Sequence, residues 1–174
     1  MSSLLTFLFI FVFLSILLAD VPLETEVYIK SWGLPGDNVF TIKDASLEDG
    51  ALLKIAPNAF ADNQKFIISY RSGYFVIKSK HSGKLLTFVQ DNDSMVQMHD
   101  IQGNYYEITQ HFTMEVRDPP VYGLRSRSKG TFLTFDFDFD YVNGHWITVS
   151  DDIKQADATY GDPQKWEFIK VNSN

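Results

Sequence analysis

Apolar residues along this chain alternate with polar ones or run in short blocks of four to six, and turn residues separate the blocks. The first segment carries Val27 and Ile29, a turn of residues 33–38 follows, and the next segment carries Phe40 and Ile42. Alternation bounded by Gly, Pro, Asn and Asp is typical of strands joined by hairpins. After residue 19 we find no convincing 3.6-residue periodicity, so the pattern predicts an all-β protein.

The same pattern occurs three times, and most of its repeated residues are 46 to 48 positions apart. Three positions repeat in each unit: a serine (Ser31, Ser79, Ser126), a threonine (Thr41, Thr87, Thr134) and a glutamine (Gln64, Gln110, Gln164). Such a period indicates repeated supersecondary units that bury their apolar faces on one another. Three units are too few for a propeller. The sequence therefore predicts a β-trefoil of roughly twelve strands, with units at about 26–70, 74–117 and 121–171.

The N-terminal segment has a different composition, with an apolar run over residues 4–18 of the 174-residue chain. The run is shorter than the roughly 20 residues that cross a bilayer. We interpret residues 1–19 as a signal peptide, although no Lys or Arg precedes the run. An uncleaved anchor is the alternative. Cleavage would leave residues 20–174 as a single secreted, extracellular domain with no membrane span.

The net charge and the cysteine content limit the classes of ligand and the source of stability. The net charge is -7 and no basic run occurs, which argues against binding to nucleic acid. Cysteine is absent, so burial of the aromatic residues, not a disulfide framework, has to stabilise the fold. The Asn92-Asp-Ser94 sequon in a polar turn makes Asn92 a candidate glycosylation site.

Each unit ends in Gln-x-Phe or Gln-x-Trp, and with this ending the chain from Glu26 to Val171 resembles the ricin B-type β-trefoil lectins. Unit one follows the family most closely, through Asp44, residues 48–50 and residues 63–66. The resemblance implies that the aromatic residue fills the core while the glutamine ties neighbouring backbone. It thus assigns structural roles to Gln64, Phe66, Gln110, Phe112, Gln164 and Trp166.

The resemblance also locates the sugar sites of the family. Members that bind galactose-like sugars place an Asp where this chain has a threonine in every unit, and a hydroxyl cannot give the charge-assisted acceptance of a carboxylate. The family's next polar position in the sugar site corresponds to Lys54, Gln97 and roughly Thr148. The position of the aromatic ring on which the sugar stacks corresponds to Ala56, His99 and roughly Ser150. Unit two comes closest to the family's set, and unit one keeps the family's asparagine. The candidate ligand-binding residues are Gln97, His99, Asn63 and Thr87.

A separate candidate lies in unit three, where Asp136, Asp138 and Asp140 alternate with phenylalanines. On a regular strand the three carboxylates share one face, which would suit Ca²⁺. The alternative is a solvated acidic face. The four histidines lack metal-ligand spacing, and neither a nucleophile elbow nor a phosphate loop occurs. We expect neither catalysis nor a cofactor.

Aromatic residues in turns are further candidates for contact with a partner. Trp32 lies in the first turn, and Tyr105 with Tyr106 forms a pair in the loop before Gln110. Sugars stack on such rings, and proteins use them as interface anchors. The sequence thus predicts a lectin-like protein that binds a glycan or glycoprotein through degenerate galactose-type sites. The alternative is a trefoil that binds a protein, as an inhibitor or secreted effector.

Overall fold

A computed structural model describes residues 21–34, 36–88, 96–99, 108–135, 145–150 and 164–172, with the backbone alone for 96–99 and 145–150. Residues 1–19, Asn92, the Tyr105–Tyr106 pair and the run of Asp136, Asp138 and Asp140 lie outside the described residues. No helix within the described residues is long and apolar enough to cross a membrane.

The described residues form twelve strands, four in each repeated unit, with three short 3-10 helices between them. Unit one contains β1 (Glu26–Ser31), β2 (Asn38–Ile42), β3 (Ala51–Pro57) and β4 (Phe66–Arg71). Unit two contains β5 (Tyr74–Ser79), β6 (Leu85–Phe88), β7 (Val96–His99) and β8 (Phe112–Asp118). Unit three contains β9 (Val121–Ser126), β10 (Phe132–Phe135), β11 (His145–Ser150) and β12 (Trp166–Lys170). The 3-10 helices are η1 (Lys43–Ala45), η2 (Asp62–Gln64) and η3 (Ile108–Gln110).

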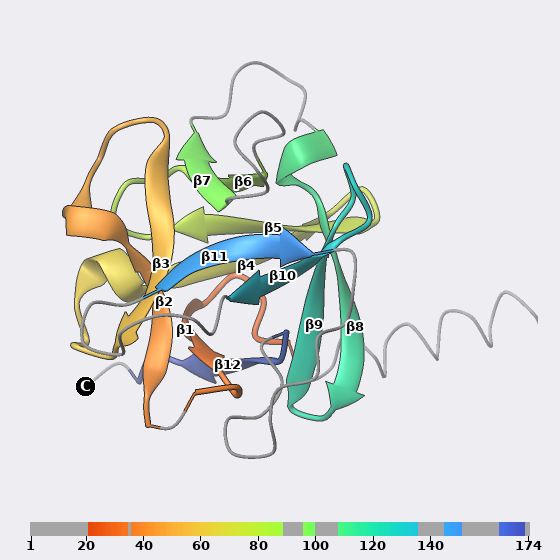
Figure 1. The fold of residues 1–174 in the computed structure, drawn as a ribbon, viewed down its shortest axis with the longest axis horizontal. Coiled ribbons are helices and arrows are strands. Elements are labelled where there is room, and N and C mark those ends of the chain that lie inside the picture. Colours follow the sequence, from red (N-terminus) through yellow and green to blue (C-terminus); the bar gives the residue numbers. More distant parts are fainter. Residues whose placement is uncertain are drawn as a thin grey trace, which may run out of the picture.

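The first and last strands of the three units close into a six-stranded antiparallel barrel. The pairing runs from β1 to β4, β5, β8, β9 and β12, and β12 pairs with β1 again. The remaining strands form the hairpins β2–β3, β6–β7 and β10–β11, which meet one another where β3 pairs with both β7 and β11 (Figure 1). A closed barrel leaves no exposed sheet edge. This is the β-trefoil that the repeats predict.

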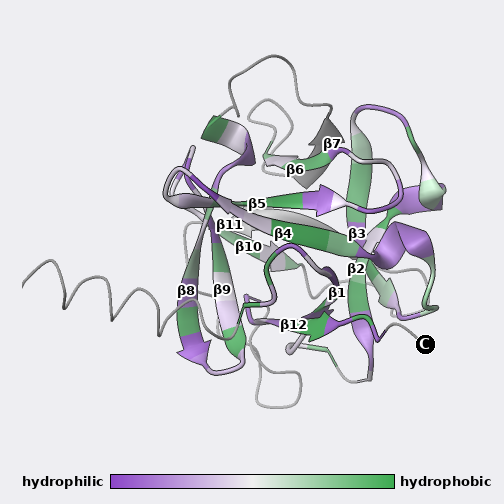
Figure 2. Ribbon diagram, turned by 180° about the vertical axis from the view of Figure 1, so that it is seen from behind, coloured by the Kyte–Doolittle hydropathy of each residue, from purple (hydrophilic) through white to green (hydrophobic). Residues whose placement is uncertain are grey.

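The core fills the barrel with the aromatic residues of the repeats. Phe66, Phe112 and Trp166 are fully buried, each at the start of the last strand of its unit. The Trp166 ring lies 4.7 Å from that of Phe40, measured between centroids, and its Nε1 donates to the Leu133 carbonyl at 3.2 Å. Hydrophobic positions are concentrated in the strands and hydrophilic ones in the turns (Figure 2). The structure therefore confirms that these three aromatic residues belong to the core.

The repeated serines are buried at the ends of β1, β5 and β9, where they organise the turns that follow. The hydroxyls of Ser31 and Ser79 accept hydrogen bonds from the N–H groups of Gly33 and Ser82, at 3.2 and 3.3 Å. Both hydroxyls thus satisfy backbone N–H groups of the turns. Ser126 differs, because its Oγ lies 3.1 Å from the Oγ of Ser128.

Candidate functional site

The repeated threonines, which stand at the galactose-type positions, are buried and their hydroxyls form hydrogen bonds inside the protein. Each Oγ1 accepts a bond from the Nε2 of the glutamine of the same unit: Gln64 to Thr41 at 3.0 Å, Gln110 to Thr87 at 3.2 Å and Gln164 to Thr134 at 2.7 Å. Each Oγ1 also donates to the carbonyl two residues earlier. A hydroxyl has one proton and two lone pairs, so its proton and one lone pair are already used.

Gln64 shows why the glutamine is structural. Its Nε2 also donates to the Pro57 carbonyl at 2.9 Å, and its Oε1 accepts the N–H of Ala59 at 2.8 Å. The side chain therefore joins β2, through Thr41, to the end of β3 and to the loop that follows it. This arrangement agrees with the backbone-tying role that the sequence resemblance implies.

The strand register aligns the remaining galactose-type positions. Thr41, Thr87 and Thr134 pair with Lys54, Gln97 and Thr148 across the hairpins. The neighbouring pairs place Ala56, His99 and Ser150 at the equivalent platform position. Two of the four candidate residues therefore lie on β7, where Gln97 is opposite Thr87 and His99 is opposite Leu85.

The other two candidates have structural partners. The hydroxyl of Thr87 is buried against Gln110, so the structure does not present it as a free sugar contact. Asn63 lies in unit one, apart from the β6–β7 hairpin, and its Nδ2 donates to the Ile42 carbonyl at 2.8 Å. This bond attaches η2 to the end of β2.

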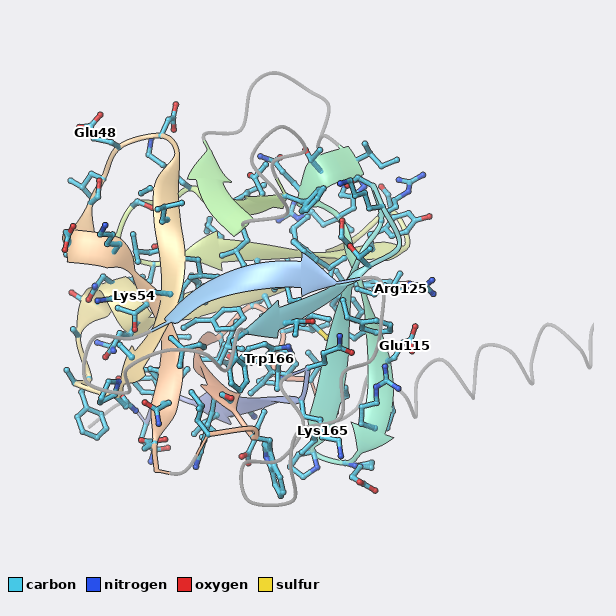
Figure 3. All side chains as sticks on the ribbon, viewed as in Figure 1. Glu48, Lys54, Glu115, Arg125, Lys165 and Trp166 are labelled. Carbon is cyan, nitrogen blue, oxygen red and sulfur yellow. The ribbon has the colours of Figure 1, made fainter. Side chains whose placement is uncertain are left out.

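Sequence reasoning missed the three junctions at which one unit meets the next. The residue after each repeated serine donates its backbone N–H to the carbonyl of the residue after a repeated glutamine: Trp32 to Lys165 at 3.0 Å, Lys80 to Lys65 at 2.9 Å and Arg127 to His111 at 2.9 Å. We call these the Trp32, Lys80 and Arg127 junctions. Trp166, beside Lys165, lies in the interior of the molecule (Figure 3). The backbone is equivalent at the three junctions, and only the side chains differ.

Those side chains give each junction its own chemistry. Lys80 forms an ion pair with Glu26, and Arg127 lies over the Tyr74 ring, with its Cζ 4.0 Å from the ring centroid. The indole Nε1 of Trp32 donates to the Glu167 carboxylate at 3.1 Å, while the residue stays 52% exposed. The Trp32 junction therefore presents a large apolar ring to solvent.

A second exposed ring lies on the same side of β1. Tyr28 and Lys30 lie two residues apart on β1 and so share one face of the strand that leads to Trp32; Lys30 is partly exposed there, whereas Tyr28 is buried. Phe60, which is 69% exposed, contacts Tyr28 edge-on, with centroids 6.1 Å apart and planes at 84°. Phe60 covers Tyr28 at one end of the strand, and Trp32 follows the other end four residues later, a span of about 13 Å in extended chain.

Polar side chains lie between the two rings. Lys30 is the cross-strand partner of Glu167, and its Nζ lies 3.7 Å from the Asp37 carboxylate. The Nδ2 of Asn58 donates to Asp37 at 3.0 Å, and its Oδ1 accepts the N–H of Phe60 at 2.9 Å. We define the β1–β12 surface as Trp32, Glu167, Lys30, Asp37, Asn58 and Phe60.

Phe60 adopts an unfavourable backbone conformation, with φ of 58°. A residue with a Cβ loses about 1–2 kcal/mol in this left-handed region. The Phe60 N–H donates to the Oδ1 of Asn58 and the Ala59 N–H donates to the Oε1 of Gln64, and these two bonds keep the loop in place. The protein thus holds an exposed phenyl ring at a strained position, which is a pattern common at functional sites.

No protein-family model matches the chain, and no curated protein matches it. Solved structures do match it. The designed threefold protein ThreeFoil aligns with 84% of this chain and 99% of its own, at 19% identity and a TM-score of 0.68. A Culex salivary protein of a cysteine- and tryptophan-rich family aligns with 88% and 97%, at 16% identity and a TM-score of 0.67. The C-terminal half of the earthworm R-type lectin, solved with GalNAc, aligns with 84% and 99%, at 16% identity and a TM-score of 0.59. At these identities the likeness establishes the fold.

Proposed function

We propose that this chain is a secreted, lectin-like protein that binds carbohydrate through the β1–β12 surface. The observation that carries the proposal is the pair of exposed rings, Trp32 and Phe60, with polar and charged side chains between them. Residues 1–19 serve as the signal peptide in this proposal, and residues 20–174 form the mature protein.

The surface has the chemistry that a sugar requires. The apolar face of a pyranose packs on an aromatic ring, while its hydroxyls need donors and acceptors around the rim. Glu167 and Asp37 offer carboxylate acceptors, and Lys30 and Asn58 offer donors between them. Bonds in which one partner is ionised are stronger than neutral ones. An oligosaccharide that reaches from Trp32 toward Phe60 would pass over these polar groups.

The hairpins are a weaker candidate for the same function. Threonines occupy the three galactose-type positions, so these sites are degenerate in our proposal. Gln97 and His99 on β7 remain a second candidate position, because the register sets them opposite Thr87 and Leu85. The earthworm lectin bound to GalNAc and a galactanase that shares the fold support carbohydrate as the ligand class. This chain spans only 31% of that galactanase, at 19% identity and a TM-score of 0.68.

A protein partner is the second candidate function. It is favoured by the absence of the family's carboxylate at Thr41, Thr87 and Thr134. Exposed aromatic residues such as Trp32 also anchor protein interfaces.

A glycan array distinguishes the two candidates. The sample is the mature protein secreted from eukaryotic cells, compared with Trp32→Ala, Phe60→Ala and Leu47→Ala. Leu47 is 55% exposed and lies outside the β1–β12 surface, so it controls for the loss of an exposed apolar side chain. We expect wild type and Leu47→Ala to bind the same glycans, and the other two variants to lose them. A wild-type protein that binds no glycan would refute carbohydrate binding and leave the protein partner.

A further inference from the structure

At the Arg127 junction, the guanidinium of Arg127 is held by the rings of Tyr74 and His111 and not by a described carboxylate. The guanidinium lies over the Tyr74 ring, and its Nη1 donates to the Nδ1 of His111 at 3.1 Å. The Tyr74 and His111 rings are stacked, with centroids 5.2 Å apart and planes within 2°. His111 is 8% exposed, whereas Arg127 is exposed. Two rings thus orient a guanidinium at the protein surface.

His111 is suited to positioning Arg127 without competing for its ligands. Burial, and then the nearby Arg127 charge, lower the pKa of His111. The imidazole is therefore neutral at neutral pH, and its Nδ1 can accept the bond from Arg127. A guanidinium has five N–H donors in one plane, and contact of its Cζ with the Tyr74 face uses none of them, so four remain besides the one that His111 accepts.

The Lys80 junction gives an internal comparison. Glu26 and Tyr74 are the first residues of the equivalent six-residue strands β1 and β5, and Lys80 and Arg127 directly follow β5 and β9. Lys80 pairs with Glu26, but Arg127 meets Tyr74 at the same place. The carboxylate that neutralises one cation is replaced by a ring at the other. Within the described ranges, no carboxylate lies within ion-pair distance of Arg127.

Other cations surround this junction in a protein whose net charge is -7. Arg71 is exposed and is the cross-strand partner of Tyr74, and Lys129 is exposed two residues beyond Arg127. The ammonium of Lys129 lies 5.2 Å from the Phe88 ring centroid. Arg125, by contrast, is 3.5 Å from Glu115 beside it (Figure 3). Among these cations, Arg127 is the one whose guanidinium is oriented by two rings while no described carboxylate lies within ion-pair distance of it.

We propose that Arg127, oriented by Tyr74 and His111, binds an oxyanion, namely the sulfate or carboxylate group of a ligand. Planar N–H donors match such oxygens in a bidentate geometry, and this charge-assisted pairing is stronger than a neutral hydrogen bond. The group could belong to an acidic polysaccharide or to a free anion, and both present the same oxygens. This site does not depend on the β1–β12 surface or on the proposed function.

The test uses three variants of the mature protein that each lower the net charge by one: Arg127→Ala, Tyr74→Glu and Lys80→Ala. Tyr74→Glu gives Arg127 the carboxylate that Lys80 already has, and the Glu26 position shows that the fold accepts it. The probes are inorganic sulfate, followed through the Arg127 Nε–H and His111 resonances by NMR, and immobilised heparin. Melting curves confirm that each variant is folded.

We expect sulfate to shift the wild-type Arg127 and His111 resonances in a saturable manner, and Lys80→Ala to behave alike. Arg127→Ala and Tyr74→Glu should weaken sulfate or heparin binding about tenfold or more. Retention on heparin points to a polymer as the source of the anion, and a response to sulfate alone points to a free anion. The proposal is overturned if neither probe binds, if Lys80→Ala weakens binding as much as Arg127→Ala, or if folded Tyr74→Glu binds like wild type.

Discussion

Thr41 and Gln64 are hydrogen-bonded to each other, and the structure predicts a different loss of stability when each is replaced. Replacement of Gln64 by Leu removes three hydrogen bonds and leaves the Ala59 N–H, the Pro57 carbonyl and the Thr41 hydroxyl without this partner. At about 1 kcal/mol for each bond, we expect a loss of roughly 3 kcal/mol in the free energy of unfolding. Thr41→Val removes two hydrogen bonds, the one from Gln64 and the one to the Val39 carbonyl, while Gln64 keeps the Pro57 carbonyl and the Ala59 N–H, so we expect a smaller loss of about 2 kcal/mol.

Urea unfolding of the mature protein measures both values, and the double variant gives the coupling between the residues. We expect a coupling of about 1 kcal/mol, because the two residues share one hydrogen bond. Circular dichroism should show the melting temperature falling by about 2–4 °C per kcal/mol for a domain of this size. Equal costs for Gln64→Leu and Thr41→Val, or a cost below about 1 kcal/mol for Gln64→Leu, would refute the structural role of the glutamine.

Three further predictions concern the hairpin, His111 and the acidic run. Thr87→Asp should destabilise the protein by burying a carboxylate and should not create binding to galactose-agarose; strong retention of a stable variant would contradict the closed position that we describe. The pKa of His111 is lowered in the folded state, so its contribution to stability should be complete above about pH 6.5 and should be lost as the pH falls through the folded pKa. His111→Gln should therefore reduce the pH dependence of the free energy of unfolding, measured with urea, over that range. An unchanged pH dependence in this variant would disprove the prediction. Millimolar calcium should raise the melting temperature no more than sodium chloride of equal ionic strength, whereas a calcium-specific rise that disappears in Asp138→Asn would locate a cation site in the acidic run.

The fold could be predicted because the repeated residues have the same structural role in each unit. Ser79, Thr87 and Gln110 recur in register with their counterparts, and each performs a buried role that any copy of the unit needs. Alternation of apolar positions and turn residues then sets the strands. The strand register also reproduces the equivalence of Lys54, Gln97 and Thr148 that the sequence resemblance implies.

The candidate surfaces could be predicted only in part. Trp32 stands out in the sequence as a ring in a turn, but its bond to Glu167 depends on the pairing of β1 with β12. Phe60 has no sequence signal, since its exposure follows from a loop that Asn58 and Gln64 hold together. The difference between Arg127 and Lys80 becomes visible only when the junctions are superimposed, because Tyr74 and Glu26 are distant from them in sequence. Local patterns set strands, whereas contacts between units set these surfaces.

The most direct test of carbohydrate binding at the β1–β12 surface is a heteronuclear NMR titration of the mature protein with a glycan that binds on the array. The indole N–H of Trp32, assigned with Trp32→Phe, reports on the bond to Glu167. We expect this resonance and the backbone amides of Lys30, Asn58 and Phe60 to shift together and saturate with the glycan. Shifts confined to Thr87, Gln97 and His99, with the Trp32 indole unmoved, would contradict the account and return the binding site to the β6–β7 hairpin.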